Sequence, residues 1–367
     1  MLIVDAHEDL AYNMLTYGRD YTRSAAETRA LESGTIEIKA KEDTLLGWPD
    51  YQRGRVALIF ATLFSTPARL RSGDWDHLCY ANIGEANRLY RSQLDLYHRL
   101  VDDNPKAFRL VESRKDLDEV LAGWEAVQSI NNEDAPDTPV GLVVSMEGAE
   151  GVGGPAELED WWAGGVRWIG LAWAGNQYCG GTREPGGLSR QGFELLEGMS
   201  SLGFGLDISH MDQAAALQAL DFYPDTVIAS HSNANALLRG LEGNRHLNDD
   251  VIRILLDRDG VIGILPYNGF LQPGWKQGDR RESLSLMHVV AHIDYICQIA
   301  GDAHHVGIGS DFDGGFGRQS VPPEIDTIAD LQKLAPLLSE RGYSDDDIYA
   351  IFAGNWINRL QRILPGP

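Results

Sequence analysis

The sequence predicts a (β/α)8 TIM barrel of the α/β class, on three observations. Eight short segments rich in apolar and β-branched residues recur along the chain, and a longer segment with helical periodicity follows each. Eight parallel strands close this kind of barrel, and 367 residues suit one barrel with insertions. An open doubly wound sheet would instead need a glycine-rich turn after the first strand, where the chain has Asp5-Ala-His7-Glu-Asp9.

The predicted strands are near-continuous apolar runs, as expected for strands that are buried on both faces. They are Leu2–Ala6, Val56–Phe64, Val140–Met146, Val166–Ala172, Gly205–Ile208, Thr226–Ala229, Val261–Pro266 and His305–Gly309. The predicted helices place apolar residues three and four positions apart. They are His77–Asp103, Lys115–Ile130, Gln191–Leu202, Gln213–Phe222, Asp249–Asp257, Ser285–Ala300, Ile328–Glu340 and Asp345–Ile363.

The chain is predicted to form a single barrel domain over residues 1–367. No long linker rich in proline, glycine or serine divides it. Residues 16–54 are polar and irregular, which predicts a long insertion after the first strand. Asn131–Thr138 is predicted to be a surface connector.

Composition and charge narrow the class of protein. The net charge is −23, which disfavours nucleic acid and anionic membranes as partners. The N-terminus has no basic segment followed by an apolar run, and no apolar run reaches about 18 residues, the length of a membrane span. The three cysteines are widely spaced and are expected to be buried thiols. We therefore expect a cytoplasmic protein.

Histidines and acidic residues follow five of the predicted strands. They are His7 and Asp9 after the first strand, Glu147 after the third, His210 after the fifth, His231 after the sixth and Asp311 after the eighth. The carboxyl ends of barrel strands meet at one face, which is where active sites lie in this fold. These side chains are therefore expected to converge.

Metal binding is the interpretation that the convergence favours. His7 and Asp9 are two residues apart, so both side chains point to one side of an extended segment. His210 and His231 come from neighbouring strands, and a glutamate can bridge two ions through its two oxygens. Zinc binds this mixture of nitrogen and oxygen ligands. Each residue alone has a structural explanation, since an acid after a strand is often a helix cap, as expected for Asp212.

Short motifs carry a resemblance to a known family. They are DAHEDL, SMEGAE, DISHMD, ASHSNA, RHLNDDVIR, GSDFDGG and AGNWINRL. In this order, from the first strand to the last helix, they resemble the motifs of the renal or membrane dipeptidases, peptidase family M19, which are amidohydrolase-like metal-dependent hydrolases.

The resemblance implies a site and an activity. It implies two zinc ions (other divalent ions can replace them), with His7 and Asp9 on one, His210 and His231 on the other, and Glu147 bridging both. The implied activity is a binuclear zinc dipeptidase that hydrolyses small dipeptides by a metal-bridging hydroxide. Asp311 and Glu147 are its expected catalytic residues. The substrate is expected to be a dipeptide or an N-acyl amino acid, and the resemblance suggests a homodimer.

Substrate contacts are expected from three further residues. Arg245 matches the arginine that binds the substrate carboxylate, although a short insertion separates it from His231. The stretch Leu171-Ala-Trp173-Ala-Gly-Asn176 places Trp173 where the family has a histidine. Trp173 and Asn176 are therefore predicted to contact the substrate, and the missing histidine points to a changed substrate.

Two alternatives remain open at this stage. One is an N-acyl-D-amino acid deacylase or another small amide or cyclic-amide hydrolase that uses the same site, which the missing histidine favours and Arg245 disfavours. The other is a non-catalytic metal-binding barrel, which the full set of ligands with Asp311 disfavours.

Overall fold

The computed structural model describes residues 1–35, 42–128, 138–241 and 243–366. Eight parallel strands run in the order β11-β10-β7-β6-β2-β1-β13-β12. They are β1 (Ile3–Glu8), β2 (Val56–Leu63), β6 (Val140–Met146), β7 (Val166–Gly170), β10 (Gly205–Asp207), β11 (Val227–Ile228), β12 (Ile262–Ile264) and β13 (Val306–Ile308). A parallel bridge between Ala229 and Ile262 joins the two ends of this order. The predicted (β/α)8 barrel is confirmed.

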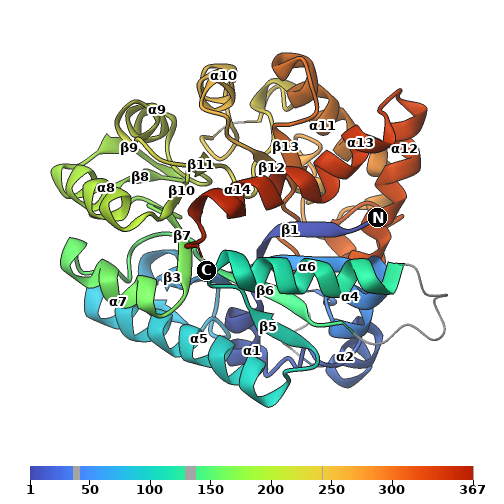
Figure 1. Ribbon diagram of the computed structural model, residues 1–367, viewed down its shortest axis with the longest axis horizontal. Helices are drawn as coiled ribbons and strands as arrows, with labels where there is room; N and C mark the ends of the chain where they lie inside the picture. The colour runs from blue at the N-terminus through green and yellow to red at the C-terminus, as the bar shows by residue number, and fades with distance from the viewer. Residues whose placement is uncertain (36–41, 129–137, 242, 367) are drawn as a thin grey trace.

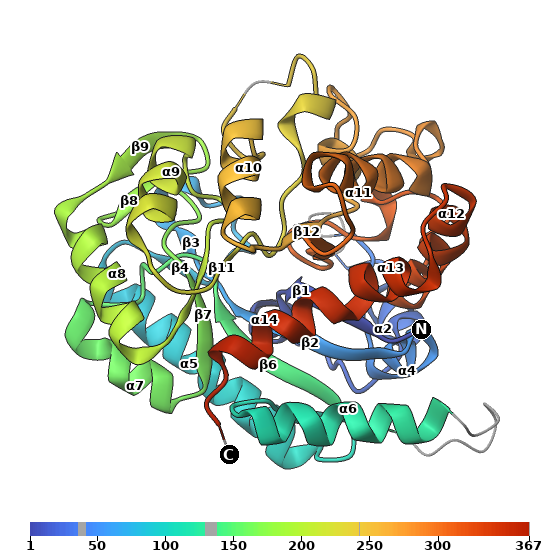
Figure 2. The same ribbon diagram turned by 45° about the horizontal axis from the view of Figure 1, so that its top comes forward.

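Helices surround the strands (Figures 1 and 2). They are α1 (Leu10–Tyr17), α2 (Ala25–Glu32), α4 (Trp48–Gly54), α5 (Ile83–Asp103), α6 (Arg114–Gln128), α7 (Leu158–Ala163), α8 (Arg190–Leu202), α9 (Gln213–Phe222), α10 (Asp249–Asp257), α11 (Leu286–Ala300), α12 (Leu334–Glu340), α13 (Asp345–Tyr349) and α14 (Asn355–Ile363). Short 3₁₀ helices span Ala68–Leu70, Pro155–Glu157, Asn235–Leu237, Asn268–Phe270, Arg281–Ser283, Arg318–Ser320 and Ile328–Lys333, and a π-helix spans Ala350–Gly354. No helix in the described ranges is long and apolar enough to cross a membrane.

Helix α14 crosses the barrel where β13 begins (Figure 1). The Asn355 side chain donates to the carbonyls of Ala303 and Val306, both at 2.7 Å. The Trp356 ring lies so close to Gly307 that a Cβ there would approach it to 2.3 Å. A side chain larger than hydrogen at this position would therefore push α14 away from the barrel.

Five short strands lie outside the barrel order. They are β3 (Thr66–Pro67), β4 (Cys79–Tyr80), β5 (Phe108–Leu110), β8 (Cys179–Gly181) and β9 (Glu184–Leu188). The pairing of β3 with β4 corrects the predicted helix His77–Asp103, which begins only at Ile83. The Asn82 side chain accepts from the Glu85 N–H and caps that helix, so the preceding residues are free to pair as a strand.

The insertion after the first strand is more regular than predicted. Residues 16–54 contain α2 and α4, and Ser24 caps α2 with a complete capping box. The segment is anchored to the end of β13, because Asp313 accepts from Arg19 and Tyr21 at 2.9 and 2.8 Å. Most of the predicted connector Asn131–Thr138 and the last two residues of the predicted helix Lys115–Ile130 lie outside the described residues.

Candidate active site and metal centre

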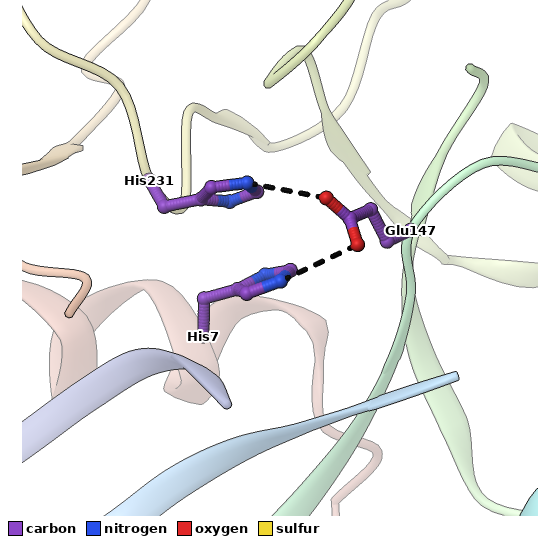
Figure 3. Close-up of side chains that lie close together, drawn as sticks. All are labelled: His7, Glu147 and His231. Carbon is purple, nitrogen blue, oxygen red and sulfur yellow. Dashed lines mark ion pairs between the residues drawn. The ribbon is translucent and has the colours of Figure 1, made fainter. Parts of the chain in front are cut away.

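Three buried side chains from distant parts of the chain meet above the barrel (Figure 3). His7 is on β1, Glu147 directly follows β6, and His231 follows β11. His210 and Asp9 lie beside them, after β10 and β1, and Asp311 follows β13. The structure thus brings together all six residues that the strand-end pattern singled out, and two overlapping groups of them have the spacing of a metal site.

Glu147 lies at the centre of this cluster and faces a different partner with each oxygen. Its Oε1 is 2.9 Å from His210 Nε2 and 3.3 Å from His231 Nε2. Its Oε2 is 3.6 Å from His7 Nε2. The same His7 nitrogen is 4.0 Å from Asp9 Oδ1 and 3.9 Å from Asp311 Oδ1. A carboxylate between two donor sets is the arrangement in which one residue can bridge two ions.

Hydrogen bonds behind His231 determine which of its ring nitrogens carries the proton. The Ser230 hydroxyl donates its only hydrogen to Asp207 Oδ2. Ser230 Oγ also lies 2.8 Å from His231 Nδ1, so this nitrogen must be the donor. Burial lowers the pKa of His231 well below its usual range, so the ring is neutral. Its Nε2 therefore presents a lone pair to Glu147.

His210 is oriented in the same way by a different partner. Thr182 Oγ1 lies 2.9 Å from His210 Nδ1 and donates at 3.4 Å to the His210 carbonyl. Burial lowers the pKa of His210 well below its usual range. With Nδ1–H donating to Thr182, Nε2 carries a lone pair and lies 2.9 Å from His231 Nε2. Backbone strain at His210, where φ is 65°, aims the ring.

This donor set fits a cation. Two histidine nitrogens and one Glu147 oxygen face one another with no proton between them, so their lone pairs repel. His7 Nε2 is buried and has no hydrogen-bond partner within the described chain. Neutral imidazole nitrogens and carboxylate oxygens are the ligands that zinc prefers, and a bound cation removes the repulsion.

The β1 side of the cluster carries more carboxylates than the side formed by His210 and His231. Asp9 occupies the N-cap position of α1 but makes no side-chain capping bond, so the helix-cap explanation fails for it. Asp212, in contrast, accepts from Ala214 N–H and caps α9 as expected. Burial raises the pKa of Asp311 well above its usual range, although the charge of neighbouring His7 works against this shift. Asp311 also has a positive φ of 56°, which is uncommon for a residue other than glycine.

A cavity of about 240 Å³ opens onto Asp9, Glu147, His210 and Asp311. Arg245 lines it and is itself buried. Its Nη1 and Nη2 donate to Ser232 Oγ at 3.1 Å and to the His231 carbonyl at 2.7 Å. Its Nε has no partner in the described part of the chain. The guanidinium is thus held in place by two bonds and keeps donors for an anionic ligand.

Trp173 lines the cavity, and Asn176 does not. The Trp173 ring packs edge-on against Phe64, with centroids 5.2 Å apart, and lies 6.1 Å from the His210 ring. The Asn176 side chain instead donates to the Leu171 carbonyl and accepts from the Tyr178 N–H. The side chain of Asn176 therefore bonds within its own loop and does not line this cavity, and a contact with the substrate stays a prediction.

Several residues at the site were missed by the sequence reasoning. Thr182 and Ser230 orient the two histidines, and Arg183 lines the cavity beside Thr182. Aromatic side chains form much of the remaining wall: Tyr12, Phe64, Trp75, Trp173, Tyr267, Phe270 and Phe316. Of these residues, only Ser230 could have been found from the sequence, because it directly precedes the candidate ligand His231.

Comparison with known proteins identifies the family of the chain. Residues 1–363 match the model of the membrane dipeptidase family, peptidase family M19. A protein from Klebsiella pneumoniae, described as an uncharacterized protein in the pqqA 5' region, is 32% identical over 62% of this chain and 83% of its own. The dipeptidase aclJ of Aspergillus oryzae is 27% identical over 98% of this chain and 77% of its own.

The fold has a close match among solved structures. A metallopeptidase from Rhodobacter sphaeroides, liganded with a phosphinate mimic of L-Ala-D-Ala, superposes with a TM-score of 0.76 at 20% identity and covers 99% of both chains. A metal cofactor is implied by this family. The chain therefore belongs to the membrane dipeptidase family, peptidase family M19, and is a metallo-dipeptidase.

Proposed function

We propose that this protein is a binuclear zinc dipeptidase that cleaves the amide bond of small dipeptides. The observation that carries the proposal is the position of Glu147, whose two oxygens face the His210–His231 pair and His7 respectively. His7, Asp9 and Glu147 would hold one ion, and His210, His231 and Glu147 the other. When bound, two zinc ions would lower the pKa of a water to about 7 and polarise the scissile carbonyl.

The protein's own groups would complete the reaction. Asp311 borders the cavity, and its Oδ1 can accept the proton of the attacking water and return it to the leaving amine nitrogen. Its pKa, raised by burial, suits a group that must hold and release a proton. Ser230 and Thr182 keep the lone pairs of His231 and His210 directed at the centre.

Arg245 would select a free carboxylate at the C-terminal end of the substrate. A guanidinium can pair with a carboxylate through two charge-assisted hydrogen bonds, and Arg245 is held at the cavity wall with Nε unused. The cavity is small and partly aromatic, which favours a short substrate. The dipeptide mimic bound by the Rhodobacter sphaeroides relative supports the same substrate class.

Trp173 would shape the substrate profile. The ring lines the cavity beside His210, at the position where the family has a histidine. A large apolar ring here narrows the pocket or stacks on an apolar side chain. Trp173→His should shift the ranking of substrates in a dipeptide library, and an unchanged ranking would show that the ring does not touch the substrate.

Metal analysis combined with matched substrates tests the proposal. The purified protein should hold two zinc-type ions per chain and cleave dipeptides, while the C-terminal amides of the same dipeptides should resist cleavage. Arg245→Met should raise KM for dipeptides, because a hydrogen bond to a charged group contributes about 1.5–3 kcal/mol. Equal cleavage of dipeptide and amide would favour the deacylase or cyclic-amide alternative. Cytoplasmic location and a homodimer stay predictions.

A further inference from the structure

Arg183 is a second arginine on the wall of the same cavity, and the proposed function does not use it. It lies in the turn between β8 and β9, and its side chain is exposed. Its guanidinium makes no hydrogen bond or ion pair within residues 1–35, 42–128, 138–241 and 243–366. An arginine that lines a cavity without a partner is available to a ligand.

The turn that carries Arg183 is held firmly against the metal centre. The Asn244 side chain accepts from the Arg183 N–H at 2.9 Å and donates to the Gly181 carbonyl at 2.9 Å. Thr182, the preceding residue, contacts His210 Nδ1. Arg183 has a left-handed φ of 67°, a conformation that these contacts stabilise. Because Asn244 directly precedes Arg245, one segment positions both arginines.

No nearby acid in the described chain neutralises Arg183. Its neighbour Glu184 is occupied by Arg69, whose Nε donates to it at 2.9 Å. Asp76, another acid of the cavity, accepts from Tyr12 OH at 2.8 Å. Arg183, His210 and Arg245 line the same cavity. The cavity wall near His210 therefore carries two cations in a protein of net charge −23.

We propose that Arg183 binds a second carboxylate on the substrate, so that the enzyme prefers dipeptides whose C-terminal residue is aspartate or glutamate. The inference rests on the proposed function, in which Arg245 takes the α-carboxylate. The side chain of the same C-terminal residue then carries its carboxylate toward Arg183. Without this cation, the net charge of −23 would make acidic dipeptides the poorer substrates.

Matched substrate pairs test this preference. Ala-Asp is compared with Ala-Asn, and Ala-Glu with Ala-Gln, using both stereoisomers of the second residue. For the zinc-loaded wild type, kcat/KM should favour the acidic member of each pair by about tenfold, which corresponds to about 1.4 kcal/mol. Arg183→Gln should bring the ratio to one or below, and Arg183→Lys should retain part of it. Arg190→Gln, an exposed α8 arginine that does not line the cavity, should leave the ratio unchanged.

Each outcome decides the proposal. A wild-type ratio of one or less, with neutral dipeptides cleaved, overturns the role of Arg183 and leaves the proposed function intact. An equal loss of kcat/KM on acidic and neutral substrates in Arg183→Gln also overturns it, because the residue would then serve the α-carboxylate or the turn. If no dipeptide of the set is cleaved by the zinc-loaded protein, the proposed function fails and this inference fails with it.

Discussion

The two halves of the candidate metal centre are built differently. On the β10–β11 side, His210 and His231 have defined proton positions, set by Thr182 and by the Ser230–Asp207 pair. On the β1 side, His7 Nε2 lies 3.6–4.0 Å from three carboxylates. Within the described residues, the one hydrogen-bond contact of His7 Nδ1 is with Thr62 Oγ1, at 3.5 Å. The first half is organised by hydrogen bonds and the second by charge.

This difference has a consequence for metal binding. The rings of His210 and His231 are already oriented, so binding a cation there requires little reorganisation of the side chains. The half formed by His7, Asp9 and Glu147, with Asp311 beside it, concentrates negative charge, and a cation must hold its ligands together. We therefore expect the histidine half to bind its ion more tightly.

Removing ligands from each half should give unequal results and the largest effects. Asp9→Ala should keep about one ion per chain after dialysis, held by the histidine half. His210→Ala should keep less, because the remaining half binds weakly. Both variants should lose nearly all dipeptidase activity. Atomic emission measures the metal content of each variant. If the two variants retain equal amounts of metal, the two halves do not differ in affinity.

Asp311 should affect turnover rather than metal content. Asp311→Asn keeps the shape but cannot accept a proton, and loss of a general acid–base group typically costs about 10²–10⁴-fold in rate. The matched control is Asp313→Asn. Asp313 is buried against Arg19 and Tyr21, so its substitution should lower Tm instead. Unchanged turnover in Asp311→Asn would remove this residue from the proton transfer.

Much of the fold and the convergence of the candidate ligands could be predicted from the sequence, and the reasons are local. Barrel strands such as Val140–Met146 are buried on both faces, so nearly all of their residues are apolar. A polar residue that ends such a run, as Glu147 does, stands out against it. Because the carboxyl ends of parallel strands meet at one face, the convergence of these residues follows from the fold class alone.

The residues that orient the ligands could not be predicted. Thr182 reaches His210 from the β8–β9 hairpin, whose glycine-rich sequence has neither strand nor helix periodicity. The amide of Asn176 bonds to Leu171 and Tyr178 of its own loop, and no pattern in the sequence indicates these bonds. Loop conformation depends on such individual hydrogen bonds, which leave no periodic pattern in the sequence.

Substitution of the residues that hydrogen-bond to the histidines should have a moderate effect on metal affinity, and this effect should differ between the two halves. Ser230→Ala removes the acceptor that keeps the proton on His231 Nδ1, and loss of such an outer partner typically costs about 10–100-fold in metal affinity. Thr62→Ala removes a 3.5 Å contact to His7, together with contacts to Ser145 and the Phe60 carbonyl, and should cost less metal affinity. Zinc affinity by chelator competition measures both. A larger loss from Thr62→Ala would contradict the view that hydrogen bonds organise only the histidine half.

The smallest predicted effect concerns Glu150, a buried acid that does not line the cavity. Burial raises its pKa from an ordinary value near 4.5 to about 7, although contacts with Asn176 and Tyr90 work against the shift. The Tyr90 hydroxyl donates to Glu150 Oε2 at 3.3 Å. In the folded protein this carboxyl therefore stays protonated at pH values where the unfolded chain has already ionised it.

The sign of the effect on stability follows from that difference. Stability falls as pH rises from about 4.5 to about 7, because the unfolded chain releases the Glu150 proton first; the full gap corresponds to at most about 3 kcal/mol. Glu150→Gln stays neutral in both states, so its Tm relative to wild type should rise with pH across this window, by a few degrees. Glu197→Gln, on the exposed side of α8, controls for the loss of one acidic residue. A Tm difference between Glu150→Gln and wild type that does not change with pH would show that Glu150 ionises as readily in the folded protein as in the unfolded chain.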